Sequence, residues 1–113
     1  MVRIHHVNLH VSEDQFGAER TFLIDGLGFR HVEPPPELVT RAHWFDDDDG
    51  VQIHLSVVED RQPLDPGHVA IVLGDQFKAV LDRITSQGCK TSGPGSIVNC
   101  WDPAGNRWEL RRG

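Results

Sequence analysis

The chain repeats its own strand pattern, and this repeat constrains the fold more than any other feature of the sequence. The segment 6–11, HVNLHV, is echoed by 68–73, HVAIVL. The segment 50–55, GVQIHL, is echoed by 105–110, GNRWEL. Each half opens on a strand that carries a histidine and closes on a strand with a histidine or a glutamate at the matching place. The repeat therefore predicts two related half-domains that share one site.

Length and composition favour a single soluble domain over residues 1–113, with one module at 1–58, a connector at 59–66 and a second module at 67–113. With 11 basic and 17 acidic residues the net charge is −6, which argues against a nucleic-acid partner. No apolar run approaches the roughly 20 residues that span a bilayer, and the start lacks the apolar stretch of a signal peptide. The two cysteines have no CxxC spacing and are expected to be free thiols in a cytoplasmic protein.

Hydrophobic periodicity assigns the same order of elements to both halves. The first half is predicted as a strand at 2–11, a helix that starts at the Ser12–Gln15 capping box and ends at Gly26 and Gly28, and strands at 29–32, 41–45 and 51–58. The second half is predicted as a strand at 68–73, a helix at 75–88, and strands at 89–91, 97–101 and 107–111, with a loop at 92–95. This order predicts an α+β fold of two tandem βαβββ modules, which form a curved, cup-like mixed sheet with the helices outside.

Four of the predicted strands have an apolar face and a polar face, because residues two apart in a strand share a face. The polar faces hold imidazole, carboxamide, carboxylate and guanidinium groups. Four of these side chains occupy matching places in the repeat and are predicted to bind one divalent metal: His6, His54, His68 and Glu109. Three imidazoles and a carboxylate suit Zn²⁺, Ni²⁺, Fe²⁺ or Mn²⁺ better than Ca²⁺ or Mg²⁺. Such a metal can polarise a substrate carbonyl or acidify a bound water.

Other polar and aromatic residues have both an ordinary and a functional interpretation. Ordinary hydrogen-bonded roles are favoured for His5, His31 and His43, and a solvated turn is favoured over a cation site for the four aspartates at 46–49. Arg107 is expected to pair with Glu109, whereas the role of Arg111 stays open. For at least one of Trp44 and Trp101, core filling is favoured over stacking on a substrate. The candidate substrate-binding residues are Asn8, Gln52, Trp44, Trp101, Arg107 and Arg111.

The segments that carry the repeat resemble the vicinal oxygen chelate superfamily, over almost the whole chain. This superfamily includes glyoxalase I, fosfomycin-resistance thiol transferases, methylmalonyl-CoA epimerase, extradiol dioxygenases and bleomycin-binding resistance proteins. The matching segments are HVNLHV at 6–11, GLGF at 26–29, IHL at 53–55, GHVA at 67–70 and, most specifically, DPAGNRWEL at 102–110. The resemblance implies a metal cup with ligands on the first and last strand of each module, which are again His6, His54, His68 and Glu109. It also implies a homodimer and a substrate chelated through adjacent oxygens.

One departure from the family pattern bears on the reaction. Bacterial glyoxalase I-like enzymes usually have a glutamate where this chain has His54, and a neutral metal-bound imidazole is a poor base, so glyoxalase I activity itself is not expected. The sequence favours a metal-dependent lyase or isomerase that acts on a small oxygenated molecule, with Glu109 as the catalytic proton shuttle. The alternatives are metal-free sequestration of an antibiotic-like small molecule and dioxygenase-type chemistry. The cup could close within one chain or across a swapped dimer.

Overall fold

The protein is described by a computed structural model that covers residues 1–93 and 95–113. The first half contains β1 (His6–Val11), η1 (Glu13–Gln15), α1 (Phe16–Thr21), η2 (Phe22–Leu27), β2 (Arg30–Val32), β3 (Ala42–Asp46) and β4 (Gln52–Val57). The second half contains β5 (His68–Val72), η3 (Gly74–Gln76), α2 (Phe77–Ser86), β6 (Thr91–Ser92), β7 (Ile97–Trp101) and β8 (Arg107–Arg111). The predicted α+β class and the tandem βαβββ order are confirmed. Pro94, in the predicted loop 92–95, lies outside the described residues.

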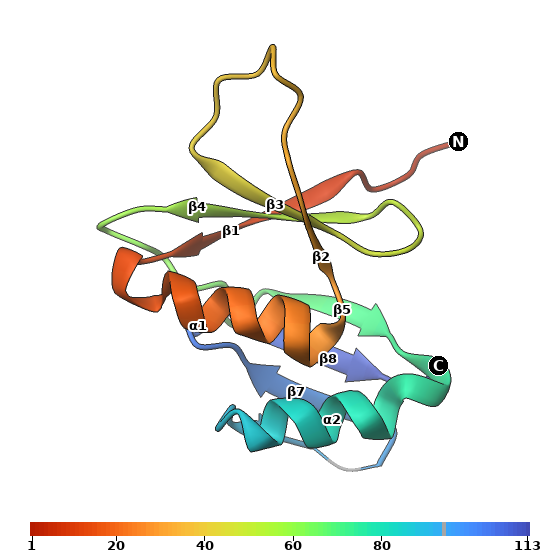
Figure 1. The fold of residues 1–113 in the computed structure, drawn as a ribbon. Helices are drawn as coiled ribbons and strands as arrows, with labels where there is room; N and C mark the ends of the chain where they lie inside the picture. Colours follow the sequence, from red (N-terminus) through yellow and green to blue (C-terminus); the bar gives the residue numbers. More distant parts are fainter. Residues whose placement is uncertain (94) are drawn as a thin grey trace.

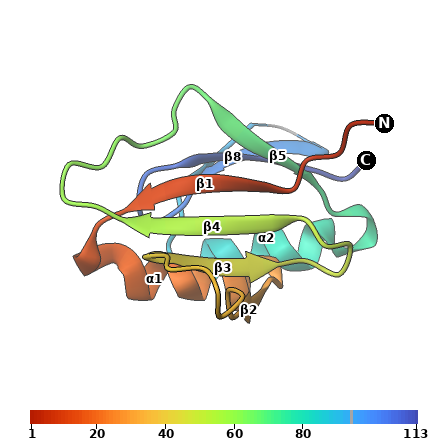
Figure 2. The same cartoon turned by 90° about the horizontal axis from the view of Figure 1, so that it is seen from above.

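Each half forms its own mixed four-stranded sheet with the same topology (Figures 1 and 2). The strand order is β1-β4-β3-β2 in the first sheet, here called sheet A, and β5-β8-β7-β6 in the second, called sheet B. In both sheets the first and last strands of the module pair in parallel, and the remaining ladders are antiparallel. The repeat in the sequence is therefore a repeat of strand pairing, and it places His54 and Glu109 on equivalent strands.

The first helical segment begins and ends where the sequence predicted. Ser12 Oγ donates to Gln15 Oε1 at 2.8 Å, and this capping box starts η1. The segment continues through α1 into the π-helical turns of η2 and ends at Gly28, whose φ of 89° suits glycine. Gly26 is needed for a different reason, because a Cβ there would lie 3.1 Å from Ile84 Cγ2 of α2. The close packing of η2 on α2 thus depends on a glycine.

The α1–η2 segment contacts both sheets and joins the two halves. Phe16 packs on His43 of sheet A with ring centroids 4.3 Å apart, and Phe22 packs on Trp108 of sheet B with centroids 5.6 Å apart. This segment lies against the apolar faces of both sheets, because its apolar residues point to two sides. Among the described residues, the largest fully buried side chains include Trp108, Phe22, Phe45 and Leu23.

The turn between β7 and β8 is held by buried polar groups. Asp102 Oδ1 accepts hydrogen bonds from the backbone N–H groups of Ala104 and Asn106, and its Oδ2 accepts one from Trp108 Nε1 at 2.9 Å. Asn106 accepts from the N–H of Leu64 in the connector and donates to the carbonyl of His10 at the end of β1. The Asp-Pro-Ala-Gly-Asn segment therefore fixes the turn and ties it to the connector and to the first half.

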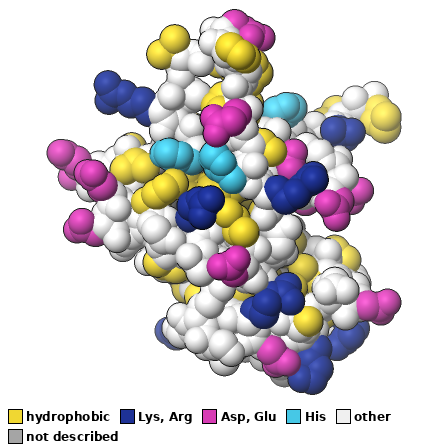
Figure 3. All heavy atoms as spheres, viewed as in Figure 1, with side chains coloured by type: hydrophobic (Ala, Val, Ile, Leu, Met, Phe, Trp, Pro, Cys, Tyr) yellow, Lys and Arg dark blue, Asp and Glu magenta, His cyan; other side chains and the backbone are white. Residues whose placement is uncertain are grey.

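Some bulk properties can also be compared with the sequence. Cys89 and Cys100 are free thiols, as predicted. No helix among the described residues is both long and apolar enough to reach across a bilayer. On the face seen in Figure 3, basic and acidic side chains are interspersed.

Candidate metal and substrate site

The outward face of sheet A brings two of the predicted metal ligands together. The rings of His6 on β1 and His54 on β4 are stacked, with centroids 3.9 Å apart and planes 10° from parallel. His5 lies next to them, with its Nδ1 2.9 Å from Nδ1 of His6. β1 and β4 pair in parallel, with Asn8 directly opposite His54. His6 lies two residues before Asn8 on β1, so its side chain is on the same face of the sheet as that of His54 and next to it.

His54 is the most enclosed of these histidines, with 5% of its surface exposed. Trp44 on β3 stacks on its other face, with centroids 4.3 Å apart and planes 5° from parallel. His54 Nε2 donates to Gln52 Oε1 at 2.8 Å. Burial, followed by the nearby His6 and His5 rings, lowers the pKa of His54 to about 4. The ring is therefore neutral near neutral pH, and because Nε2 carries the proton donated to Gln52, Nδ1 keeps the lone pair that can bind a metal.

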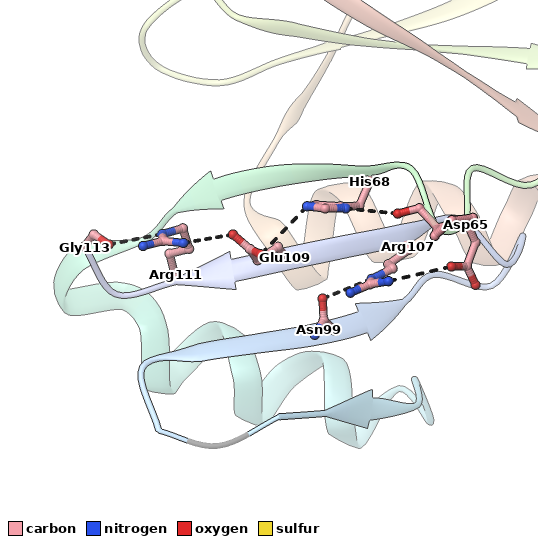
Figure 4. Close-up of polar contacts among 8 residues, drawn as sticks. Asp65, His68, Asn99, Arg107, Glu109, Arg111 and Gly113 are labelled. Atoms are coloured by element: carbon pink, nitrogen blue, oxygen red, sulfur yellow. Dashed lines mark hydrogen bonds and ion pairs between the residues drawn. The ribbon is translucent and has the colours of Figure 1, made fainter.

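The outward face of sheet B brings the other two predicted ligands together (Figure 4). His68 Nε2 on β5 lies 3.7 Å from Glu109 Oε1 on β8. His68 Nδ1 lies 3.1 Å from the carbonyl oxygen of Pro66, and because a carbonyl can only accept, Nδ1 carries the proton and donates. This hydrogen bond leaves Nε2 with its lone pair on the side of Glu109. A fixed tautomer of this kind is typical of histidines that bind metals.

The arginines on sheet B have different partners from those expected. Arg111 Nη1 donates to Glu109 Oε2 at 3.0 Å, so Arg111 is the residue that pairs with the glutamate. The pairing predicted between Arg107 and Glu109 is wrong. Arg107 Nε donates to Asn99 Oδ1 at 3.1 Å, and its Nη1 lies 3.9 Å from Asp65 Oδ1. Arg107 reaches these partners because the connector brings Asp65 to the edge of the sheet.

The remaining candidate residues also lie on these two faces. Asn8 Nδ2 donates to Ser56 Oγ at 3.0 Å across sheet A. Trp101 Nε1 donates to Asp65 Oδ2 at 3.0 Å, and Lys90 Nζ lies 5.0 Å from the centre of the Trp101 ring. In the aspartate run, Asp47 Oδ1 accepts hydrogen bonds from the N–H groups of Asp49 and Val51. That run forms a hydrogen-bonded turn, as the favoured interpretation stated.

The two ligand pairs do not meet in one chain. Residues 1–93 and 95–113 contain no group of three or more His, Cys, Asp or Glu side chains that could hold a metal ion. The reason is the position of α1–η2: its aromatic side chains pack on the apolar faces of both sheets, so the polar faces point outward on separate sheets. Each chain thus presents two separate pairs of possible metal donors, His6 with His54 and His68 with Glu109. Imidazole and carboxylate groups are donors that suit a divalent metal.

Two contacts of the site were missed from the sequence. Asp65 was placed in an unpatterned connector, although it lies only three residues before His68. The contact between Trp44 and His54 was missed because the predicted strands at 41–45 and 51–58 place Trp44 opposite Gln52. The observed turn is shifted along the chain, and the register pairs Trp44 with His54.

Comparisons with known proteins give the fold of this chain. No protein-family model matches the sequence, and no curated protein matches it. The chain is similar in structure to a putative glyoxalase family protein from Bacillus anthracis, with 22% identity, a TM-score of 0.78, and coverage of 97% of this chain and 93% of that one. A glyoxalase/dioxygenase from Nostoc punctiforme matches with 23% identity, a TM-score of 0.80, and coverage of 96% and 89%.

A third similar structure is a mutant of the fosfomycin resistance protein FosX from Listeria monocytogenes. It matches with 16% identity, a TM-score of 0.79, and coverage of 100% of this chain and 94% of that one. All three similarities extend over nearly the full length of both chains. The chain therefore shares the fold of these glyoxalase, glyoxalase/dioxygenase and fosfomycin resistance structures.

Proposed function

We propose that this protein is a divalent-metal-dependent enzyme of the lyase or isomerase type, whose site forms between two copies of the chain. The observation that carries the proposal is the pairing of donors on the outward faces: His6 with His54 on sheet A, and His68 with Glu109 on sheet B. Each pair supplies half of a set of three imidazoles and one carboxylate. A homodimer that joins sheet A of one copy to sheet B of the other would complete two equivalent sites.

One of the similar structures supports a metal and a small oxygenated ligand. The FosX structure is a complex with Mn(II) and 1S,2S-dihydroxypropylphosphonic acid, a molecule with oxygens on adjacent carbons. In this protein the four donors would hold Zn²⁺, Ni²⁺, Fe²⁺ or Mn²⁺. A bound metal of this kind polarises the substrate oxygens that it binds and stabilises negative charge on them.

Glu109 is the residue best suited to move a proton at this site. Arg111 pairs with Glu109 Oε2, so Glu109 Oε1 is the carboxylate oxygen directed toward His68. Glu109 is also the only carboxylate among the four donors. His54 is a poor base in comparison, because its pKa of about 4 reflects a ring that resists protonation. Proton transfer by one carboxylate suits an isomerisation or an elimination.

Residues beside the donors would contact the substrate. Asn8 and Gln52 lie on the same face as His6 and His54, and Arg107 and Trp101 lie on the same face as His68. Arg107 and Lys90 offer positive charge next to the Trp101 ring. These groups favour a substrate that carries polar or anionic substituents beside its chelating oxygens.

Metal analysis of the loaded, full-length protein tests the proposal. We expect about one metal ion per chain in the wild type, since a symmetric dimer would contain two equivalent sites. His54→Ala and His68→Ala should each abolish this binding, whereas the matched control His31→Ala should not, because His31 lies outside both pairs. Glu109→Gln should then lose turnover of small dioxygenated compounds. Unchanged turnover in that variant would remove Glu109 from the catalytic role.

Metal-free binding of a small molecule is the second candidate function. The observation that favours it is the exposed end of the Trp44–His54–His6 stack, which a planar molecule could extend. Failure of the wild type to bind any of the four metals would support this candidate over the enzyme. Oxygen uptake by the iron-loaded protein would instead favour dioxygenase-type chemistry.

A further inference from the structure

Three rings lie face to face across three neighbouring strands of sheet A. His6 on β1 stacks on His54 on β4 at 3.9 Å, and His54 stacks on Trp44 on β3 at 4.3 Å. The three planes are within about 10° of parallel at each contact. Trp44 is directly opposite His54 in the antiparallel register, so the backbone itself holds the two rings together.

This stack covers both faces of the His54 ring. A ring with both faces covered cannot rotate about its Cβ–Cγ bond without pushing a neighbour away. Only its edge remains available, and there Nε2 meets Gln52 Oε1 at 2.8 Å. The orientation of His54 is therefore fixed before any ligand arrives.

The Trp44 side chain makes this contact with its ring and not with its polar group. Its Nε1 is buried and has no hydrogen-bond partner among the described residues. A buried donor without a partner is unfavourable, so hydrogen bonding does not explain why a tryptophan occupies this position. What the position requires is an aromatic plane against His54.

We infer that Trp44 is a positioning residue, which holds the His54 imidazole in the orientation that binds the metal. The inference rests on the proposed function and assigns Trp44 to support of a ligand instead of contact with substrate. Partners that orient a metal ligand typically contribute 10- to 100-fold to metal affinity, roughly the effect we expect here.

The test compares Co²⁺ binding by four full-length proteins: the wild type, Trp44→Leu, Trp44→Phe and Phe16→Leu. Phe16 is the matched control, because it is an aromatic residue that packs on the opposite face of the same sheet, against His43. We expect Trp44→Leu to weaken Co²⁺ binding roughly 10- to 100-fold and to shift the visible Co²⁺ spectrum toward that of His54→Ala. Trp44→Phe should restore both properties, and Phe16→Leu should leave both unchanged.

Several outcomes would overturn the inference. If His54→Ala loses the metal while Trp44→Leu binds like the wild type, Trp44 has no positioning role and the proposed function stands. Equal weakening in Trp44→Leu and Phe16→Leu would indicate general loosening of the sheet. A wild type that binds no Co²⁺ would remove the proposed function and the inference together. Proton NMR of the wild type provides a check that needs no variant, because Trp44 should shift the ring protons of His54 upfield.

Discussion

Replacing the buried Glu19 with glutamine tests how the two halves of the chain are joined. Glu19 lies on α1, is 0% exposed, and accepts a hydrogen bond at Oε1 from the N–H of Ala104 in the second half. Its Oε2 is buried without a hydrogen-bond partner among the described residues. Burial first, and then the adjacent Asp102 carboxylate, raise the pKa of Glu19 from 4.5 to about 10. Near neutral pH the folded protein therefore keeps a proton on the Glu19–Asp102 pair, whereas the unfolded chain loses it.

The sign of the effect follows from proton linkage. Between pH 4.5 and about 10 the folded state binds one more proton than the unfolded state, so the stability of the wild type falls as pH rises through this window. One proton changes the free energy of unfolding by about 1.4 kcal/mol per pH unit, or about 4 kcal/mol between roughly pH 5 and pH 8. Glutamine keeps the shape and the acceptor oxygen but cannot ionise, so Glu19→Gln should not show this loss.

Urea unfolding at a series of pH values measures this difference. The free energy of unfolding of Glu19→Gln minus that of the wild type should increase steadily with pH. Glu13→Gln, an exposed glutamate in η1, serves as the matched control, and its difference from the wild type should stay nearly flat. Parallel stability curves for Glu19→Gln and the wild type would refute the account of a protonated carboxyl between the halves.

Three further substitutions test the turn and the helix end by urea unfolding. Asn106→Ala should destabilise the protein by about 2–3 kcal/mol, because the N–H of Leu64 and the carbonyl of His10 both lose a partner. Trp108→Phe should cost about 1–3 kcal/mol, because Asp102 Oδ2 loses its buried donor. Gly28→Ala should cost about 1–2 kcal/mol from backbone strain alone, since φ is 89° and no atom lies within 4 Å of the added Cβ. Wild-type stability of Asn106→Ala or Trp108→Phe would contradict the role of the hydrogen bonds that they remove, and wild-type stability of Gly28→Ala would contradict the backbone strain expected there.

The local structure could be predicted from the sequence because it depends on local periodicity. The alternation of Val7, Leu9 and Val11 with polar residues fixed the faces of the first strand, and the strands at 97–101 and 107–111 match β7 and β8. The internal repeat also placed the donors on equivalent strands. The sequence predicted that His6, His54, His68 and Glu109 share one site, whereas the structure places them in two pairs on separate sheets.

The arrangement of the two halves could not be predicted in the same way. It depends on α1–η2 packing against both sheets, and on Glu19, which looks like an ordinary surface residue of an amphipathic helix. A glutamate inside a protein gives no periodic signal, because only distant residues such as Ala104 and Asp102 make its burial possible. The partners of Arg107 and Arg111 could not be predicted either. Both arginines lie on the same face as Glu109, and only their side-chain conformations decide which of them pairs with it.

The central claim, that one metal site combines donors from two copies, is tested most directly by mixing two inactive variants. His54→Ala lacks the sheet A pair, and His68→Ala lacks the sheet B pair, so neither homodimer contains an intact site. After the two proteins are unfolded together and refolded in equal amounts, about half of the dimers should be mixed, and each should hold one intact site. The account predicts that metal binding returns to about a quarter of the wild-type amount per chain. No recovery in the refolded mixture, with both proteins folded, would contradict a site shared between copies.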